Sequence, residues 1–156
     1  MSSRIVFGLL FAGYTVLLGF VGFRPTPVDR EASPAVWWWI RAVRRAGFEW
    51  YSYEFLEFSA NVLLFVPLGL LGVLAVGLRF WWAPLIFGVA ATVVIETGQA
   101  MLLPERFPST TDVIANSIGT ALGVAAGCVI LAVQASGRRS RASGAAQAAG
   151  QGRPSP

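Results

Sequence analysis

Long apolar stretches alternate with short polar ones along the chain, and four of them are long enough to cross a lipid bilayer. They occupy residues 5–23, 58–78, 81–103 and 112–133. A membrane-spanning helix needs about 20 predominantly apolar residues, and each stretch meets this length. The first stretch is long for a signal peptide and lacks a small-x-small cleavage site before Arg24, so we interpret it as a retained span. The pattern predicts an all-α membrane protein built as a bundle of about four transmembrane helices.

A segment with a different pattern separates the first two spans. Its apolar positions Val36, Ile40 and Val43 share one helical face. The other positions carry Trp37, Trp38, Trp39, Arg41, Arg44 and Arg45. Arginine and tryptophan beside an apolar face are typical of a helix that lies in the headgroup region. We therefore expect a short amphipathic interfacial helix that begins after Ser33 and ends at Gly47; the alternative is an irregular aromatic loop.

The composition changes again after Val133. Residues 136–156 are small, polar and basic, with no side chain large enough to build a core, which predicts a disordered tail. The chain thus divides into a transmembrane domain, residues 1–135, and a tail, residues 136–156. Arg138, Arg139 and Arg141 follow the last span and favour the cytoplasmic side. An even number of spans then places both termini in the cytoplasm and the loop 104–111 on the outer face.

Polar residues gather at one end of the last three spans. Glu96 and Gln99 share a helical face, and antiparallel packing brings Asn116 to the depth of Gln99. The candidate ligand-binding residues are Asn61, Glu96, Gln99, Arg106, Asp112 and Asn116. A charge inside the bilayer costs at least about 2.5–3.5 kcal/mol unless it has a partner or water. The cluster therefore predicts a polar, outward-opening pocket, with Glu96 as the candidate catalytic residue if chemistry occurs there.

Two structural interpretations stand beside this functional one. The cluster, with Arg106 as the cation nearest to Glu96, could be a hydrogen-bonded clamp that only fixes helix packing. Residues 109–112 also have the pattern of a capping box, Ser-Thr-Thr-Asp. In such a box Ser109 caps the helix, and the Asp112 carboxylate reaches back to a main-chain amide.

Small residues and one proline predict how the spans pack. Gly119 and Gly123 recur one turn apart on the fourth span, and Gly69 lies on the second. Such ridges let helix backbones approach closely in membranes, either within one chain or between protomers of a homo-oligomer. Pro67 removes a main-chain donor and should kink the second span near Leu63.

Composition excludes several classes of function. Charged residues make up 13% of the chain, against about 25% in soluble domains, so lipid is the expected solvent. The chain has no histidine, the commonest general base and zinc ligand, and its one cysteine, Cys128, lies in an apolar run. We therefore predict no metal site and no cofactor. We also predict no nucleic-acid partner, because the arginines flank the spans.

Together these residues resemble the VanZ-like family of bacterial membrane proteins. The resemblance rests on the segment 61–69, the Glu96 and Gln99 pair, an arginine seven residues after Gln99, and the pattern D-x-x-x-N-x-x-G-x-x-x-G. The matching positions are Asn61, Phe65, Pro67, Gly69, Glu96, Gln99, Arg106, Asp112, Asn116, Gly119 and Gly123. They cover roughly residues 57–123. The resemblance implies a multi-pass protein of the bacterial cell membrane. The founding member of that family is associated with low-level resistance to the glycopeptide teicoplanin, without an established reaction.

Three functions are consistent with these observations. The one we favour is binding of a lipid-linked or acylated envelope molecule, such as a lipid-linked cell-wall precursor or a glycopeptide, with Arg106 holding a phosphate or carboxylate. The second is an intramembrane hydrolase or transferase with Glu96 as general base, although no nucleophile motif supports it. The third is a proton-linked transporter that uses Glu96, although four spans leave little room for alternating access.

Overall fold

The computed structural model describes residues 3–23, 34–102 and 109–151, and within them it is helical with no strand. The helices are α1 (Ser3–Gly22), α2 (Pro34–Arg45), α3 (Tyr53–Val76), the 3-10 helix η1 (Leu78–Phe80), α4 (Trp82–Leu102) and α5 (Thr110–Gln151). Four of these helices, α1, α3, α4 and α5, are long and apolar enough to cross a membrane. The predicted all-α bundle of four spans is therefore confirmed.

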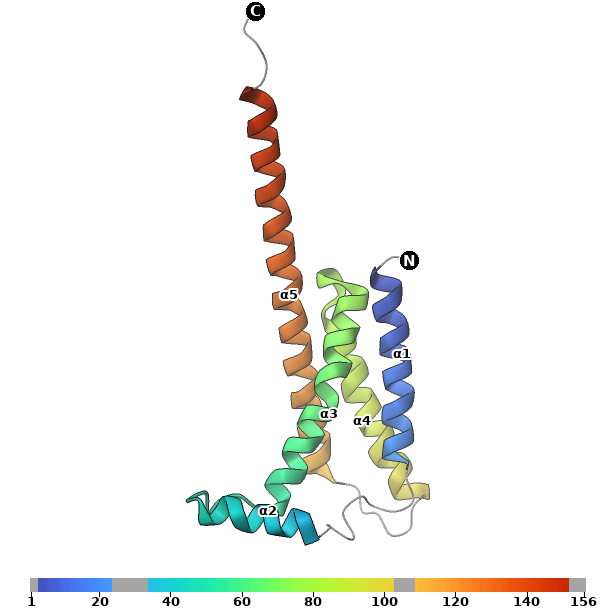
Figure 1. Ribbon diagram of the computed structural model, residues 1–156. Coiled ribbons are helices and arrows are strands. Elements are labelled where there is room, and N and C mark those ends of the chain that lie inside the picture. Colours follow the sequence, from blue (N-terminus) through green and yellow to red (C-terminus); the bar gives the residue numbers. More distant parts are fainter. Residues whose placement is uncertain (1–2, 24–33, 103–108, 152–156) are drawn as a thin grey trace, which may run out of the picture.

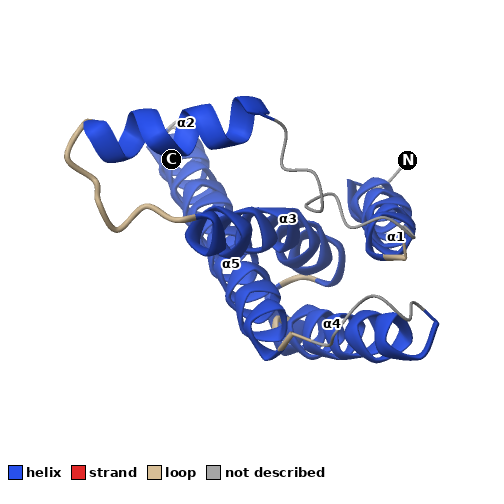
Figure 2. Cartoon of the chain, turned by 90° about the horizontal axis from the view of Figure 1, so that it is seen from below, coloured by secondary structure: helices blue, strands red, loops and turns tan. Residues whose placement is uncertain are grey.

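The four long helices lie side by side, and α2 lies across one end of the bundle (Figure 1). In the view along the bundle, α2 is seen lengthwise while the spans are seen nearly end-on (Figure 2). Helix α3 contacts the three other spans, most extensively α5. Because α3 touches every other span, polar residues at its start can meet groups from all of them.

Glycines allow the close approach of α3 and α5. A Cβ added at Gly123 would overlap the carbonyl oxygen of Val66, and one at Gly69 would overlap that of Thr120. Gly119 likewise faces a main-chain carbonyl of α3. The predicted ridge of small residues therefore packs within the chain, which is the first of the two alternatives that the sequence left open.

Helix α3 contains Pro67 and continues past it to Val76. The proline has no N–H for the carbonyl of Leu63, and the predicted kink there stays a prediction. One residue further on, the carbonyl oxygen of Leu64 accepts a 2.7 Å hydrogen bond from the Tyr14 hydroxyl of α1. A side chain of a neighbouring helix thus supports the main chain of α3 next to the proline.

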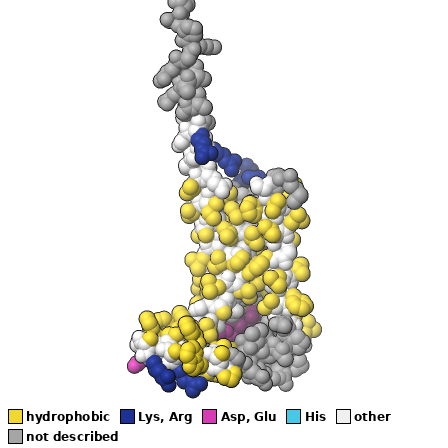
Figure 3. Space-filling view, in the orientation of Figure 1, with side chains coloured by type: hydrophobic (Ala, Val, Ile, Leu, Met, Phe, Trp, Pro, Cys, Tyr) yellow, Lys and Arg dark blue, Asp and Glu magenta, His cyan; other side chains and the backbone are white. Residues whose placement is uncertain are grey.

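Apolar side chains cover the outside of the bundle. The buried core is small and contains Leu18, Phe65 and Leu68, while many large apolar side chains of the spans are exposed. Figure 3 shows hydrophobic side chains over the bundle between arginines at one end and acidic side chains near the other. Soluble proteins rarely expose apolar surface of this extent, so the exposed apolar side chains suit a chain whose solvent is lipid.

Helix α2 forms where the sequence predicted a short amphipathic helix. Ile40 is buried, Val36 and Val43 are half-buried, and all three arginines are exposed. The helix is followed by Gly47, whose φ of 102° is a conformation that favours glycine. The predicted cap, Ser33, lies outside the described residues, and the placement of α2 in the headgroup region stays a prediction.

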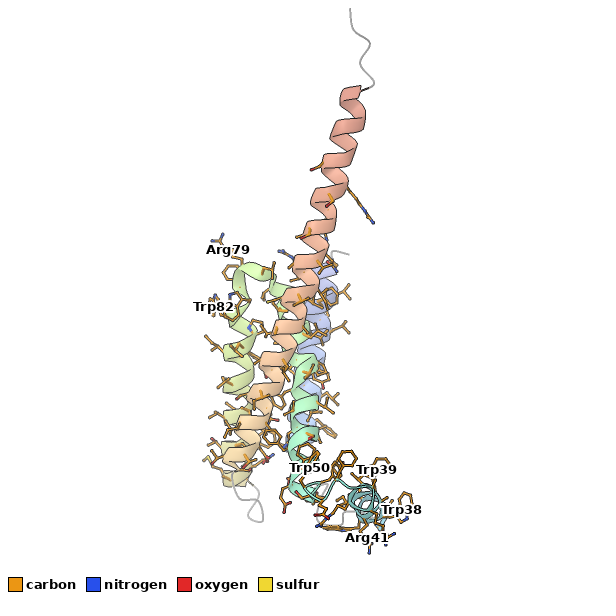
Figure 4. All side chains as sticks on the ribbon, turned by 90° about the vertical axis from the view of Figure 1, so that its left-hand side faces the viewer. Trp38, Trp39, Arg41, Trp50, Arg79 and Trp82 are labelled. Atoms are coloured by element: carbon orange, nitrogen blue, oxygen red, sulfur yellow. The ribbon has the colours of Figure 1, made fainter. Side chains whose placement is uncertain are left out.

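Aromatic contacts join α2 to the start of α3. The rings of Trp37 and Tyr53 stack with centroids 5.8 Å apart, and the Trp50 ring meets that of Phe55 edge-on. Figure 4 shows Trp38, Trp39 and Trp50 at this end of the molecule. The aromatic residues thus gather at the same end of the bundle as α2.

The tail departs from the sequence-based prediction. Helix α5 continues to Gln151, well beyond the bundle (Figure 1), so the predicted disorder is wrong for residues 136–151. Alanine is the best helix former and is frequent here. Because the transmembrane part of α5 is already helical, the segment extends it without a new nucleation step. The last residues, 152–156, lie outside the described part of the chain.

Candidate functional site

A cavity of about 230 Å³ lies between the four spans, at the end of the bundle near α2. Its polar lining consists of Glu57, Asn61, Glu96, Gln99, Asp112 and Asn116. The structure therefore brings together every predicted ligand-binding residue that it describes. Arg106 lies outside the described residues. The grouping follows the sequence-based expectation, while the ligand-binding role of these residues stays a prediction.

Two side chains cap the start of α5, those of Ser109 and of Glu96 on α4. The Asp112 main-chain amide donates a 3.2 Å hydrogen bond to Ser109 Oγ, as the capping-box pattern predicts. The Ser109 main-chain amide donates to Glu96 Oε2 of α4 at 2.9 Å. The capping-box pattern assigns this second part to Asp112, whose Oδ1 accepts a 2.9 Å hydrogen bond from Asn61 Nδ2 of α3.

This arrangement explains why the membrane tolerates a carboxylate at Glu96. Its side chain is buried, and one oxygen accepts a hydrogen bond from the main-chain amide of Ser109, the residue directly before α5. A helix N-terminus carries partial positive charge, which stabilises an anion placed against it. Glu96 therefore has a partner within the protein, as an intramembrane charge requires.

Gln99 ties α4 to the end of α1. Its Nε2 donates a 2.8 Å hydrogen bond to the carbonyl oxygen of Gly22, the last residue of α1. Carbonyl groups in the last turn of a helix lack a donor within the helix. Gln99 thus satisfies one of these groups and holds α1 at the edge of the cavity.

Asn116 is the most buried polar residue of the cavity lining, with 5% of its surface exposed. Its Nδ2 donates a 2.9 Å hydrogen bond to Oγ1 of Thr92, which is fully buried. Its Oδ1 is buried and has no hydrogen-bond partner within the part of the chain that the structure describes. Leaving a buried acceptor unsatisfied costs about 1–3 kcal/mol, so Asn116 is the cavity residue whose hydrogen bonding is incomplete among the described residues.

The polar groups therefore both join helices and line the cavity; the predicted clamp with Arg106 stays a prediction. The amide nitrogens of Asn61, Gln99 and Asn116 bind protein acceptors on three different helices. The cavity lining contains the carboxylates of Glu57, Glu96 and Asp112 and, among the described residues, no arginine. What it presents to a ligand is mainly hydrogen-bond acceptors. No group of three or more carboxylate, cysteine or histidine side chains in the described segments is arranged to hold a metal ion.

The contribution of α1 was missed by the sequence analysis. Leu18, Val21 and Gly22 line the cavity beside the polar residues of the other spans. None of these three residues has a polar side chain, and a main-chain carbonyl carries no sequence signal.

A four-span helical bundle whose buried polar groups converge on a cavity at one end defines a multi-pass membrane protein with an intramembrane polar site. The family model described as VanZ/LLP1 matches residues 11–131, and the chain belongs to this family. The matched region begins well before residue 57, so it includes most of α1 and all of α2. No curated protein and no solved structure matches the chain.

Proposed function

We propose that this VanZ-family protein binds part of a lipid-linked or acylated envelope molecule in the cavity, within the bacterial cell membrane. The observation that carries the proposal is the side chain of Asn116, which lines the cavity and whose buried Oδ1 has no partner among the described residues. Buried polar atoms in proteins are nearly always hydrogen-bonded, so a donor from outside the chain is expected there.

The cavity suits an amphipathic ligand. Its polar residues lie beside an apolar wall made of Leu18, Val21, Leu64, Phe65 and Ile95. Its volume of about 230 Å³ is below the roughly 300–1,000 Å³ of sites that enclose a drug-sized ligand. The cavity therefore takes one group of a larger molecule, and the rest of that molecule lies in the lipid or outside it. A complete glycopeptide does not fit inside.

The charge of the lining favours a hydrogen-bond donor as this group. Three carboxylate residues line the space, so a hydroxyl, amine or amide N–H is preferred over an anion. The anion-binding role expected for Arg106 is an independent prediction, because that residue lies outside the described part of the chain.

The orientation belongs to the same proposal. With both termini in the cytoplasm, the cavity end and α2 face the outside of the cell, where envelope molecules occur. In a Cys128→Ser background, a membrane-impermeant maleimide should label Glu49→Cys in intact cells and Ser140→Cys only after permeabilisation. The reverse labelling would place the cavity on the cytoplasmic side and exclude an outward-facing site.

The link to glycopeptides can be tested by filling the cavity without touching its hydrogen bonds. Ala60 lines the cavity and is exposed, so Ala60→Phe should occupy the space at little cost to folding. Ala90 is also exposed, on α4, and does not line this cavity, so Ala90→Phe is the matched control. Cells with equal membrane levels of each variant are compared for teicoplanin susceptibility. We expect the parent protein and Ala90→Phe to change teicoplanin susceptibility alike, and Ala60→Phe to lose this change. If both variants change susceptibility equally, the cavity has no part in glycopeptide susceptibility.

Binding and turnover are separated by Glu96→Gln. This change keeps the volume and an acceptor for the Ser109 amide while it removes the charge. If the protein only binds its lipid, incubation with that lipid gives no product in either form. Product formation that Glu96→Gln abolishes would support the hydrolase or transferase, and proton uptake coupled to the lipid in liposomes would support the transporter.

A further inference from the structure

A second and larger cavity lies at the opposite end of the bundle. It has a volume of about 600 Å³, which is within the usual range for ligand sites. Its walls come from the start of α1, the turn between α3 and α4, and the part of α5 that leaves the bundle. Each of these elements contributes one arginine: Arg4, Arg79 and Arg138.

This cavity, which we name the arginine pocket, has no acidic side chain in its described lining. All acidic residues in the described segments lie toward the other end of the molecule: Glu49, Glu54, Glu57, Glu96 and Asp112. Figure 3 shows one group of arginines at the end of the bundle away from the acidic side chains, and a second group at the α2 end. Three like charges that border one space repel each other, and an anion between them would remove that repulsion.

The remaining walls of the arginine pocket are largely apolar. They include Phe7, Leu74, Leu78, Ile130 and Leu131. Trp81 and Trp82 are half-exposed beside the turn that carries Arg79 (Figure 4), and tryptophan favours the membrane interface. An anion at this level with an apolar wall beside it has the chemistry of a lipid headgroup with its acyl chains.

Gly77 keeps the space next to Arg4 open. Its φ of 83° favours glycine, and an added Cβ would lie 3.0 Å from a terminal guanidinium nitrogen of Arg4. Because Gly77 has no side chain, the guanidinium group of Arg4 can lie against the main chain of this turn, at the edge of the pocket.

We propose that the arginine pocket binds the phosphate group of an anionic membrane lipid. The guanidinium groups of Arg4, Arg79 and Arg138 hold the phosphate oxygens, for which their planar donor geometry is suited. The acyl chains lie against the apolar wall. Basic pockets between transmembrane helices are a known form of lipid recognition, and this one is separate from the polar cavity of the proposed function.

The test measures which lipids remain on the full-length protein. The protein is inserted into nanodiscs of phosphatidylcholine with a minor fraction of phosphatidylglycerol, extracted, and analysed by mass spectrometry. The triple variant Arg4→Gln, Arg79→Gln, Arg138→Gln should retain about tenfold less phosphatidylglycerol, since the phosphate loses all three guanidinium groups that border the pocket. The matched control is Arg41→Gln, Arg44→Gln, Arg45→Gln on α2, which removes the same charge away from the pocket. We expect this control to retain phosphatidylglycerol as the parent protein does.

A second variant tests the pocket without a change of charge. Ala135 is exposed and lines the pocket, so Ala135→Trp should fill it and also lower phosphatidylglycerol retention. Equal retention by the parent protein and the pocket triple variant, or an equal loss in the α2 triple variant, would overturn the proposal.

Competition with inorganic phosphate distinguishes the two sources of the phosphate group, a lipid headgroup and free phosphate. Displacement of phosphatidylglycerol by equimolar phosphate would assign the pocket to a soluble phosphate and overturn the lipid assignment.

Discussion

Replacement of Gly123 by alanine tests whether the close contact of α3 and α5 holds the bundle together. A Cβ at this position would overlap the carbonyl oxygen of Val66 and lie 2.8 Å from the main-chain nitrogen of Leu70. Both atoms belong to the backbone of α3, so no side chain can rotate away to make room. The two helices must therefore move apart along the contact.

The size of the effect follows from two opposing contributions. Overpacking a tight contact costs about 1–3 kcal/mol, and a clash with main-chain atoms belongs at the upper end of this range. Alanine favours a helix over glycine by about 1 kcal/mol. We therefore expect Gly123→Ala to lower the free energy of unfolding by about 2 kcal/mol. Gly137 on the same helix has nothing within 4 Å of an added Cβ, so Gly137→Ala should be neutral or slightly stabilising.

The assay is reversible unfolding in mixed detergent micelles, followed by circular dichroism at several protein concentrations. A loss of stability in Gly123→Ala that does not depend on concentration agrees with packing inside one chain. Equal stabilities of the two alanine variants would refute the packing argument. A loss that grows on dilution would show that the ridge joins protomers.

Three further predictions concern the hydrogen bonds around the cavity. Ser109→Ala should lower stability by about 1 kcal/mol because α5 loses its cap, whereas Ser140→Ala, at an exposed hydroxyl of the same helix, should have no measurable effect in the same unfolding assay. Tyr14→Phe should cost about 0.5–1.5 kcal/mol, because the Leu64 carbonyl of α3 loses the hydrogen bond from the Tyr14 hydroxyl; a smaller effect would mean that lipid or water replaces the hydroxyl. Thr92→Val should cost about 1–3 kcal/mol by leaving the Asn116 amide without its acceptor. Combining it with Asn116→Leu should recover part of this loss, and strictly additive losses would contradict the pairing.

Periodicity was sufficient to predict most of the polar residues of α3, α4 and α5 that meet at the cavity, although not Glu57. Glu96 and Gln99 are three residues apart on one helix, and Asn61 and Asn116 lie about one turn inside their own spans. Once four spans alternate in direction, these positions have to lie at a similar depth at one end of the bundle. The same reasoning predicted the cap at Ser109, because a cap depends only on neighbouring residues.

The partners of these residues could not be predicted in the same way. The bond from the Ser109 amide to Glu96 depends on how the segment between α4 and α5 places the start of α5. Gln99 binds a carbonyl of Gly22, and every residue has a carbonyl. The helix after Val133 was missed for a different reason: low hydrophobicity argues against a packed core, but it does not prevent alanine-rich sequence from extending a helix that has already formed.

The most direct test of the polar cavity is the lipid that accompanies the purified protein. The parent protein, Ala60→Phe and Ala90→Phe are extracted from the same bacterial membranes under mild conditions, and bound species are identified and counted by mass spectrometry. If the cavity holds one group of a lipid-linked or acylated envelope molecule, such a molecule is enriched on the parent and on Ala90→Phe and is lost from Ala60→Phe, whose folding is unchanged. Identical lipid profiles for all three proteins would contradict binding in the cavity and leave its polar residues with the structural role of joining the four spans.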